Sequence, residues 1–534
     1  MSKTAAQFLV DTLIEAGVRH LFTLSGNQIL SIYDATIGRD IQLIHTRHEA
    51  AAVHMADAWG RLMEDPPGVA LVTAGPGHCN ALSALYVALM AESPLLLLSG
   101  HCPRSLIGKG AFQEIDQVAV ARPVTKASWL VEDPDQMGND IRRALSLCQS
   151  GRPGPIHLSL PSDVLESPVQ FSQSPLPTVS KEGSLTPTSA EASEAQVLDL
   201  LQGAERPLIV SGPAMTRNSR WEQVTELAQA TQIPALPMDS PRGVNDPWMH
   251  GANHCLFESD LVLLLGKKLD FSLRFGEFPF SPETRFVQID ADAEELRQHG
   301  RVVLSIHEDP AQMARSLTAS AGNRRWGGDS WRQKVHVSRT MEPEPWSEWR
   351  QSSSRPIHPL RVCETLQPHL DQGAILISDG GEFGQWAQAG LAAQIRLTNG
   401  PSGAIGSSIP MAIAAKLAHP ERLVVAISGD GTIGYHLSEF DTAVRYALPL
   451  VVVVGNDARW NAEYQLQVQH YGEERAVACE LLLSRYDKAV EALGGYGEFV
   501  SDPAEIVPAL ERSLASQLPA CVNIHVEGLR APTF

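Results

Sequence analysis

Residues 426–437, AISGDGTIGYHL, place a glycine-rich turn between an expected strand and an expected helix. The apolar run 423–427 is typical of a buried strand, and apolar side chains recur at helical spacing from Leu437 to Leu448. A turn between the carboxyl end of a strand and the amino end of a helix presents backbone N–H groups and a helix dipole to a phosphate. The stretch therefore predicts a phosphate site in an α/β fold rather than an ordinary surface turn.

Asp430 separates two interpretations of this turn. Gly429, Gly431 and Gly434 fit the dinucleotide pattern GxGxxG, but a carboxylate is an unfavourable neighbour for a pyrophosphate, and Asp457 follows Asp430 by 27 residues rather than the usual distance of about 20. In the second interpretation a right-handed crossover brings the ends of two parallel strands together, so that Asp430 and Asp457 face one Mg²⁺. A metal makes Asp430 a ligand, which favours the second interpretation.

Short apolar runs that alternate with helical segments recur along the chain in three sets, from residues 21, 207 and 374. Strands that are apolar on both faces are typical of parallel sheets covered on both sides. The pattern predicts an α/β protein with three doubly wound parallel-sheet domains. Ser167–Ser193 and Gly322–His358 resemble connections, since neither has the pattern of a sheet element. The expected domains are 1–166, 194–321 and 359–534.

The composition excludes several classes of partner. The 534 residues carry a formal net charge of −19 and show no basic patch, which argues against binding to nucleic acid or an anionic membrane. The seven cysteines are scattered without C-x-x-C spacing, so neither a zinc site nor a disulfide framework is indicated. We expect a cytoplasmic protein, because residues 1–16 lack the pattern of a secretory signal and no membrane-spanning run is present.

The segment GDGTIGYHLSEFDTAVRYALPLVVVVGND, residues 429–457, resembles the motif of thiamine diphosphate-dependent enzymes, which begins with GDG and ends in NN or ND. The resemblance implies Mg²⁺ held by Asp430, Asp457 and the backbone carbonyl of Arg459. It also implies a diphosphate bound against the glycine turn and the loop 379–382. The cofactor-binding residues implied in this domain are Gly381, Glu382, Gly429, Asp430, Gly431, Thr432 and Asp457.

Two further segments resemble parts of the same family. In HTRHEAAAVHMADAWGR, residues 45–61, Glu49 is similar to the glutamate that binds N1′ of the aminopyrimidine ring and activates the cofactor. Burial would keep this carboxyl protonated or strongly hydrogen-bonded, whereas a structural glutamate would only complement a helix amino terminus. In NGPSGAIGSSIPMA, residues 399–412, the carbonyl of Gly403 would accept from the 4′-amino group, and Ile405 would hold the cofactor in its bent form.

The first domain is most similar to acetolactate synthases, through TAGPG at 73–77, PRSLIGKGAFQEIDQ at 103–117 and SGRPGPIHLSLP at 150–161. This resemblance implies that Phe112 and Gln113 line the pocket and that Gln113 hydrogen-bonds the substrate; the alternative is a packing role. After the first strand the chain departs from the synthases, because Ser25, Gly26, Asn27 and Gln28 replace a proline and two glycines. Asn27 and Gln28 would therefore offer different polar groups to the substrate.

The segment WNAEY, Trp460–Tyr464, also departs from the synthases. It places Trp460 at the expected pocket and Glu463 six residues after Asp457, the spacing at which pyruvate decarboxylases have a catalytic glutamate. GYHLSEFDTAVR is similar to benzaldehyde lyase, and LLGKKLDFSLRFG is similar to 2-hydroxyacyl-CoA lyases and oxalyl-CoA decarboxylases. These departures make FAD, which acetolactate synthases carry in the central domain, doubtful for this chain.

The resemblance implies an enzyme that uses thiamine diphosphate and Mg²⁺. The first hypothesis is a decarboxylating carboligase of acetolactate synthase type that acts on a 2-keto acid, and the second is a lyase that cleaves a 2-hydroxy ketone or a 2-hydroxyacyl-CoA to an aldehyde. A cofactor-binding regulator without turnover is a third hypothesis, disfavoured by Glu49. The family builds its site between two subunits, which implies a homodimer or homotetramer.

Overall fold

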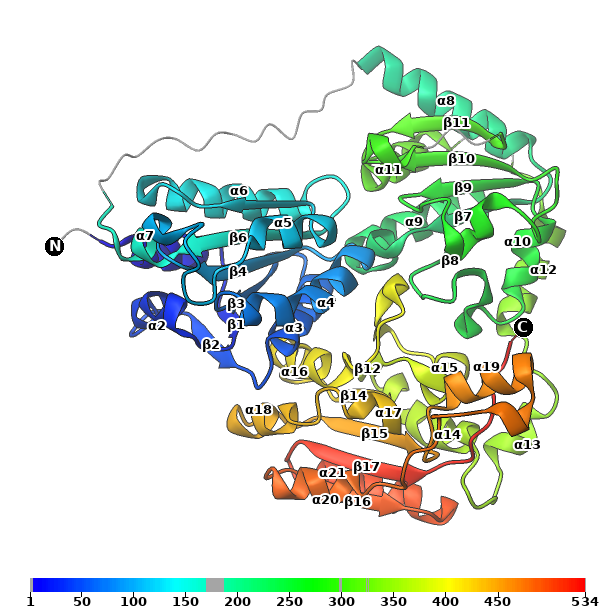
Figure 1. Cartoon of the computed structure of the whole chain (residues 1–534). Helices are drawn as coiled ribbons and strands as arrows, with labels where there is room; N and C mark the ends of the chain where they lie inside the picture. The colour runs from blue at the N-terminus through cyan, green and yellow to red at the C-terminus, as the bar shows by residue number, and fades with distance from the viewer. Residues whose placement is uncertain (1–2, 170–186, 297–299, 323, 325, 534) are drawn as a thin grey trace. The chain divides into compact units, whose positions relative to one another are not determined.

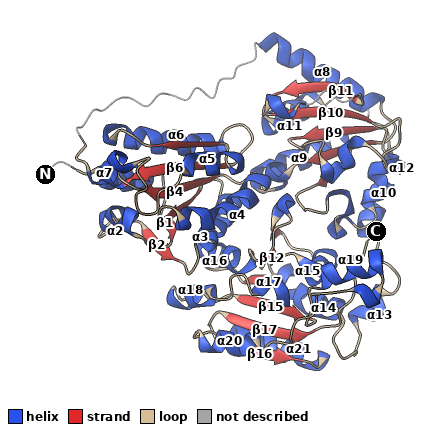
Figure 2. Cartoon of the chain, in the orientation of Figure 1, coloured by secondary structure: helices blue, strands red, loops and turns tan. Residues whose placement is uncertain are grey.

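The computed structural model describes residues 3–169, 187–296, 300–322, 324 and 326–533, and within them it contains three parallel sheets with helices on both sides of each (Figure 1, Figure 2). This architecture confirms the predicted α/β class with three doubly wound domains. The first and third sheets belong to one compact unit, and the central sheet belongs to another. No helix in the described part of the chain is both long and apolar enough to cross a membrane.

The first sheet has the strand order β2-β1-β3-β4-β6-β5. From β1 the chain passes to β2 on one side and then to β3 on the other, so the loops after β1 and β3 diverge at the carboxyl edge of the sheet. The strands are β1 His20–Thr23, β2 Gln42–His45, β3 Gly68–Val72, β4 Leu95–His101, β5 Ala127–Leu130 and β6 Pro155–Pro161. The helices are α1 Ala5–Glu15, α2 Leu30–Ala35, α3 Glu49–Leu62, α4 Pro76–Met90, α5 Gln117–Ala121, α6 Met137–Gln149 and α7 Ser162–Glu166.

The central sheet has the strand order β11-β10-β9-β7-β8. Helix α12 lies within the expected connection 322–358, and its Trp331 is buried in the same apolar cluster as Phe286 of the sheet. Residues 170–186 of the other expected connection lie outside the described residues. The strands are β7 Pro207–Ser211, β8 Ala235–Pro237, β9 Leu261–Leu265, β10 Arg285–Asp290 and β11 Val302–His307. The helices are α8 Pro187–Gly203, α9 Asn218–Thr231, α10 Ala252–Glu258, α11 Pro310–Ser320 and α12 Asp329–Thr340.

The third sheet has the strand order β13-β12-β14-β15-β17-β16. Its order reverses between β12 and β14, and β14 pairs in parallel with β15, as the crossover argument predicts. The strands are β12 Ile375–Ser378, β13 Ile395–Thr398, β14 Val424–Gly429, β15 Val451–Asn456, β16 Tyr496–Val500 and β17 Ala520–His525. The helices are α13 Trp346–Arg350, α14 Pro359–Asp371, α15 Gly381–Gly390, α16 Ser408–Ala418, α17 Asp430–Ile433, α18 Glu439–Arg445, α19 Asn461–Tyr471, α20 Tyr486–Ala492 and α21 Ile506–Ala515.

Helix α3 joins the first domain to the third within one chain. It is rich in alanine and buried along its whole length, as expected of a helix that is covered on every side. One buried apolar cluster contains Val53 and Ala56 of α3 together with Ile409 and Ile413 of α16. The two sheets of this unit therefore share a core.

A buried ion pair lies at the end of α3. Arg61 donates from Nε to Oδ1 of Asp57 at 2.8 Å and from Nη1 to the carbonyl of Thr398 at 2.5 Å. Asp57 is fully buried and Arg61 is 5% exposed. The guanidinium thus connects α3 to the end of β13.

We expect Asp57→Ala to lower the free energy of unfolding by about 3–5 kcal/mol, because it leaves the Arg61 guanidinium buried without its carboxylate. The measurement is the midpoint of thermal unfolding by calorimetry. A control variant that combines Asp57→Leu with Arg61→Met removes both charges and should regain at least half of the lost midpoint. A double variant as unstable as Asp57→Ala would contradict this account.

Candidate active site

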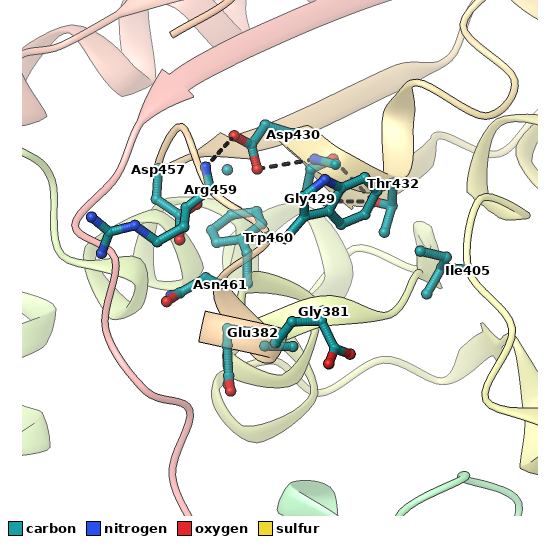
Figure 3. Close-up of a pocket in the computed structure, with 15 residues that line it drawn as sticks. Gly381, Glu382, Ile405, Gly429, Asp430, Thr432, Asp457, Arg459, Trp460 and Asn461 are labelled. Atoms are coloured by element: carbon teal, nitrogen blue, oxygen red, sulfur yellow. Dashed lines mark hydrogen bonds between the residues drawn. The ribbon is translucent and has the colours of Figure 1, made fainter. Parts of the chain in front are cut away.

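A pocket lies at the carboxyl edge of the third sheet, where the strand order reverses. Loops that leave neighbouring strands in opposite directions at such a point create a crevice, which is the usual ligand site of open α/β sheets. The wall is formed by four segments that follow β12, β13, β14 and β15 (Figure 3). The lining residues are Gly381, Glu382, Phe383, Ile405, Gly429, Asp430, Gly431, Thr432, Gly455, Asp457, Arg459, Trp460, Asn461, Ala462 and Glu463.

Asp430 and Asp457 lie together at the ends of β14 and β15. Asp430 is 3% exposed and accepts from the N–H of Arg459 and from the N–H of Gly431, each at 3.0 Å. Burial raises the pKa of Asp430 to about 6. Burial, and then the nearby charge of Asp430, raise the pKa of Asp457 to about 7. The structure therefore places two carboxylates so close together that their negative charges repel one another.

The chemistry of this pair fits a divalent cation. Mg²⁺ commonly takes one or two carboxylates and completes its six oxygen ligands with phosphate, backbone or water oxygens. Within the described residues, no group of three or more His, Cys, Asp or Glu side chains is arranged to hold a metal. The guanidinium of Arg459 lies over the Tyr464 ring, 4.1 Å from its centroid, and its positive charge acts to lower the pKa of Asp457. Because a guanidinium is a cation without an acceptor, Arg459 could bind a metal only through its backbone carbonyl.

The glycine turn after β14 is closed by its own side chains. Thr432 Oγ1 accepts from the N–H of Gly429 at 2.8 Å, so this predicted cofactor-binding side chain shapes the turn. Gly431 lies against the indole of Trp460, and a Cβ added at this position would come within 2.5 Å of two ring carbons. Trp460 is thus part of the wall of this pocket, and it covers the turn.

Asp379, directly after β12, holds the opposite wall in place. Its fully buried carboxylate accepts from the N–H groups of Gly380, Gly406 and Ser408, at 2.7 to 3.1 Å. Ile405 packs so closely on Gly380 that a Cβ there would come within 2.6 Å of Ile405 Cγ2. These contacts fix the predicted wedge residue Ile405 in the pocket wall.

Three other predicted residues of the third domain have different placements. Glu382 lines the pocket, but its carboxylate accepts from the N–H of Ala531 at 2.8 Å and points away from Asp430 (Figure 3). Gly403 is exposed and is not among the described lining residues. Glu463, in the first turn of α19, is exposed and lines the pocket. Among the described lining residues, Glu463 is therefore the charged residue that α19 contributes.

The predicted residues of the first domain gather at the carboxyl edge of the first sheet. Glu49 begins α3, is 8% exposed and accepts from the side chain of Asn80 at 3.0 Å. A Cβ on Gly77, after β3, would lie 3.2 Å from Glu49 Oε1. Glu49, at the amino end of α3, is therefore held against the first turns of α4.

A chain of polar side chains runs beside Glu49. Thr73 Oγ1 contacts Gln28 Oε1 at 2.6 Å, and Gln28 Nε2 contacts Gln113 Oε1 at 3.1 Å. Asn27 is exposed, and Phe112 is 71% exposed in the single chain. The structure thus pairs Gln28 with Gln113 and leaves Asn27 and Phe112 on the surface.

The two groups of predicted residues do not meet in one chain. Among the residues that the structure describes, those lining the pocket lie at the carboxyl ends of strands of the third sheet or in the segments that follow them, and none comes from the first domain. Three residues that contact the predicted site residues, Thr73, Asn80 and Asn461, are not assigned a role by any sequence pattern described above. Asn461 directly follows the predicted Trp460, and its hydrogen bond to Asp457 acts to lower the pKa of that carboxyl against the larger effect of burial.

Comparison with protein-family models gives matches along most of the chain. Residues 3–120 match the thiamine pyrophosphate enzyme N-terminal TPP binding domain, residues 195–317 match the central domain, and residues 379–524 match the C-terminal TPP binding domain. The three matches follow the order of the three sheets.

Curated relatives cover nearly the full length. A probable acetolactate synthase of Mycobacterium bovis is 34% identical over 530 residues, which cover 97% of this chain and 95% of that protein. The 2-hydroxyacyl-CoA lyase 2 of Bos taurus is 30% identical over 538 residues, which cover 91% and 83%. The acetolactate synthase isozyme 3 large subunit of Escherichia coli is 30% identical over 540 residues, which cover 96% and 92%.

The raised pKa values of Asp430 and Asp457 predict how stability changes with pH. A carboxyl whose pKa is higher in the folded protein than in the unfolded chain contributes stability below its unfolded pKa and loses that contribution as pH rises through the folded value. In the presence of a metal chelator, thermal stability should therefore fall between about pH 4 and about pH 7, and Asp457→Asn should reduce this fall. Mg²⁺ should raise the midpoint more at the higher pH, because it binds carboxylates.

Thermal unfolding of the wild type and Asp457→Asn, each with chelator and with Mg²⁺ across this pH range, is the measurement. Asp441→Asn, which removes a partly exposed carboxylate outside the pocket, is the control. An identical pH profile for the wild type and Asp457→Asn would contradict the assignment of the pair.

Proposed function

The chain belongs to the thiamine pyrophosphate enzymes, and we propose that it is a Mg²⁺-dependent carboligase that releases carbon dioxide from a 2-keto acid and joins the remaining acyl group to a second carbonyl compound. The observation that carries this proposal is the pair of carboxylates at the switch point of the third sheet, of which Asp430 is buried and Asp457 is half-buried. The direction of the reaction follows the similarity to acetolactate synthases over almost the whole chain.

The third domain would bind the charged end of the cofactor. Bound thiamine diphosphate supplies a thiazolium carbon that adds to carbonyl groups and an electron sink for the decarboxylation. Asp430, Asp457 and the backbone of Arg459 would bind Mg²⁺, and the ion would offset the repulsion between the two carboxylates. The turn at Gly429 and Gly431 and the loop 379–382 would orient the diphosphate. The residues at the carboxyl edge of the third sheet would thus bind Mg²⁺ and position the diphosphate.

Glu49 would hold the proton that activates the cofactor. Its carboxyl is buried, hydrogen-bonded by Asn80 and fixed at the amino end of a rigid helix. A carboxyl in such a place can share a proton with a ring nitrogen at a fixed distance, which is the usual arrangement for general acid and base catalysis. Asn80 would keep the carboxyl turned toward that nitrogen.

A second copy of the chain would complete the site. The described lining of the pocket comes from the third domain alone, whereas Glu49, Gln28 and Gln113 lie at the edge of the first sheet. Phe112, 71% exposed, lies beside Gln113 in the chain and would be covered by the partner. We therefore propose a homodimer or homotetramer in which Gln113 meets the substrate opposite the pocket of the other chain.

A lyase is the second candidate, and the position of Glu463 favours it. This exposed carboxylate lines the pocket from the first turn of α19, where it could deliver a proton to a product. Protonation of the acyl-derived carbon gives an aldehyde, whereas attack on a second carbonyl gives a ligation product. The similarity to 2-hydroxyacyl-CoA lyase 2 agrees with the first outcome.

We expect Glu49→Gln to lower turnover at least about 100-fold while Mg²⁺ and thiamine diphosphate still bind, because the amide keeps the shape but cannot carry the proton. Turnover of pyruvate and calorimetric titration of the cofactor measure the two effects. Glu439→Gln is the matched control, since Glu439 is fully buried and accepts from the N–H of Arg47 outside the pocket. Near-wild-type turnover of Glu49→Gln would refute the assignment.

Proton NMR of the products formed from pyruvate, and in separate samples from benzoin and a 2-hydroxyacyl-CoA, distinguishes the two reactions, because only the lyase should cleave the last two compounds. Acetolactate would support the carboligase, and acetaldehyde would support proton delivery by Glu463. In the second case we expect Glu463→Gln to slow aldehyde release at least about 10-fold without weakening cofactor binding. Glu474→Gln, which removes an exposed carboxylate outside the pocket, is the control. Equal rates for both variants would exclude Glu463 from the reaction.

A further inference from the structure

We propose that Gln117 is a positioning residue: its side-chain amide fixes the turn at Gly75, and this turn sets the place of Gln113 in the site. The inference rests on the proposed function, because the role of Gln113 toward substrate is part of that function. It adds a residue that neither binds the cofactor nor lies in the pocket of the third domain.

The amide of Gln117 joins three segments at the carboxyl edge of the first sheet. Oε1 accepts from the N–H of Gly75 at 2.9 Å, and Nε2 donates to the carbonyl of Gly100 at 3.0 Å and to Ser159 Oγ at 3.1 Å. The backbone N–H only donates and the carbonyl only accepts, so the orientation of the amide is fixed by its partners. Gln117 is 1% exposed, and these bonds satisfy its donors and its acceptor.

Gly75 transmits this constraint to Gln113. It follows β3 with φ 57° and ψ −109°, a backbone conformation that glycine adopts more readily than other residues. A Cβ on Gly75 would lie 2.6 Å from the carbonyl oxygen of Gln113 and 2.9 Å from its Cβ. The backbone of Gln113 therefore rests directly on the turn whose N–H Gln117 holds.

Gln113 is itself held in an unusual conformation. Its φ is 60°, in the left-handed region that few non-glycine residues adopt, so surrounding contacts must hold it there. Gln28 holds its side chain, and Gly75 supports its backbone. The Cβ of Gln28 in turn lies against Gly100, whose carbonyl binds Gln117. The side-chain amide of Gln117 thus supports both residues that contact Gln113: it binds Gly75 directly, and it binds Gly100, against which Gln28 packs.

A purely structural amide would behave differently. A buried polar group contributes little net stability when all its hydrogen bonds are made, but its loss leaves its partners unsatisfied. If Gln117 only stabilised the fold, its replacement would lower the melting temperature and would combine independently with a change at Gln113. If it positions Gln113, its effect on turnover should vanish once the side chain of Gln113 is absent.

The experiment compares Gln117→Met, Gln113→Ala and the double variant in the full-length protein. We expect Gln117→Met to lower kcat/KM about 10- to 100-fold, as for a displacement of roughly 1 Å at a reacting group, and to leave thiamine diphosphate affinity unchanged. The double variant should be no slower than Gln113→Ala. Gln288→Met, which removes another amide that is 1% exposed, is the matched control and should not alter kcat/KM.

Hydrogen exchange of the cofactor-free protein supplies a readout independent of activity. The amide of Gly75 and the loop 110–116 should lose protection in Gln117→Met and keep it in Gln288→Met. In Gln117→Glu, a protonated carboxyl can accept from the N–H of Gly75 and donate one hydrogen bond. At low pH, the protection of Gly75 in this variant should therefore approach that of the wild type at the same pH. This variant also serves if Gln117→Met does not fold.

Unchanged protection in Gln117→Met, or effects of the two substitutions that multiply in kcat/KM, would overturn the inference. A wild-type protein that converts none of the tested keto acids or hydroxy ketones would instead contradict the proposed function. The exchange result would still decide whether Gln117 holds the turn.

Discussion

The repulsion between Asp430 and Asp457 is the constraint on which the carboxyl edge of the third sheet depends. Two carboxylates removed from water at neighbouring strand ends are unfavourable unless hydrogen bonds or a cation offset their charge. The chain supplies part of this offset itself, because the N–H groups of Gly431 and Arg459 both donate to Asp430. These bonds draw the segment after β15 across the glycine turn and bring Trp460 onto Gly431. The shape of the pocket thus follows from the need to stabilise one charge.

The core shared by α3 and α16 explains how one chain holds the carboxyl edges of its first and third sheets, each of which would contribute half of a site completed by a second copy. Apolar side chains of both helices form one cluster, and the N–H of Arg47 donates to Glu439 beside it. Each half is preorganised by its own sheet: backbone N–H groups bind Asp379 in the third domain, and an amide binds Gly75 in the first. Rigid edges of this kind suit a reaction that depends on placing two carbonyl compounds against one cofactor.

The sequence was sufficient for those features that depend on strand order and local pattern. The pairing of Asp430 with Asp457 followed from a single parallel crossover, and the place of Glu49 followed from its position between a strand and an alanine-rich helix. Contacts between segments that are distant in the sequence could not be predicted from it. The pairing of Gln28 with Gln113 spans 85 residues, and Asp379 is satisfied by N–H groups that no side-chain pattern marks. The surface position of Phe112 likewise depends on a loop without periodicity.

The packing of Gly431 against Trp460 changes how the signature of this domain should be used as evidence. A side chain at 431 would displace the indole whether or not a cofactor binds, since its Cβ alone would overlap the ring. The second glycine of the GDG motif is therefore required by the fold as well as by the diphosphate. A descendant that had lost catalysis would still be selected to retain it and to retain Asp430, whose carboxylate holds Gly431 and Arg459. Asp457, whose charge is opposed by that of Asp430, would lose its purpose without a cation. In this branch Asp457, rather than the glycines, is the better marker of an active enzyme.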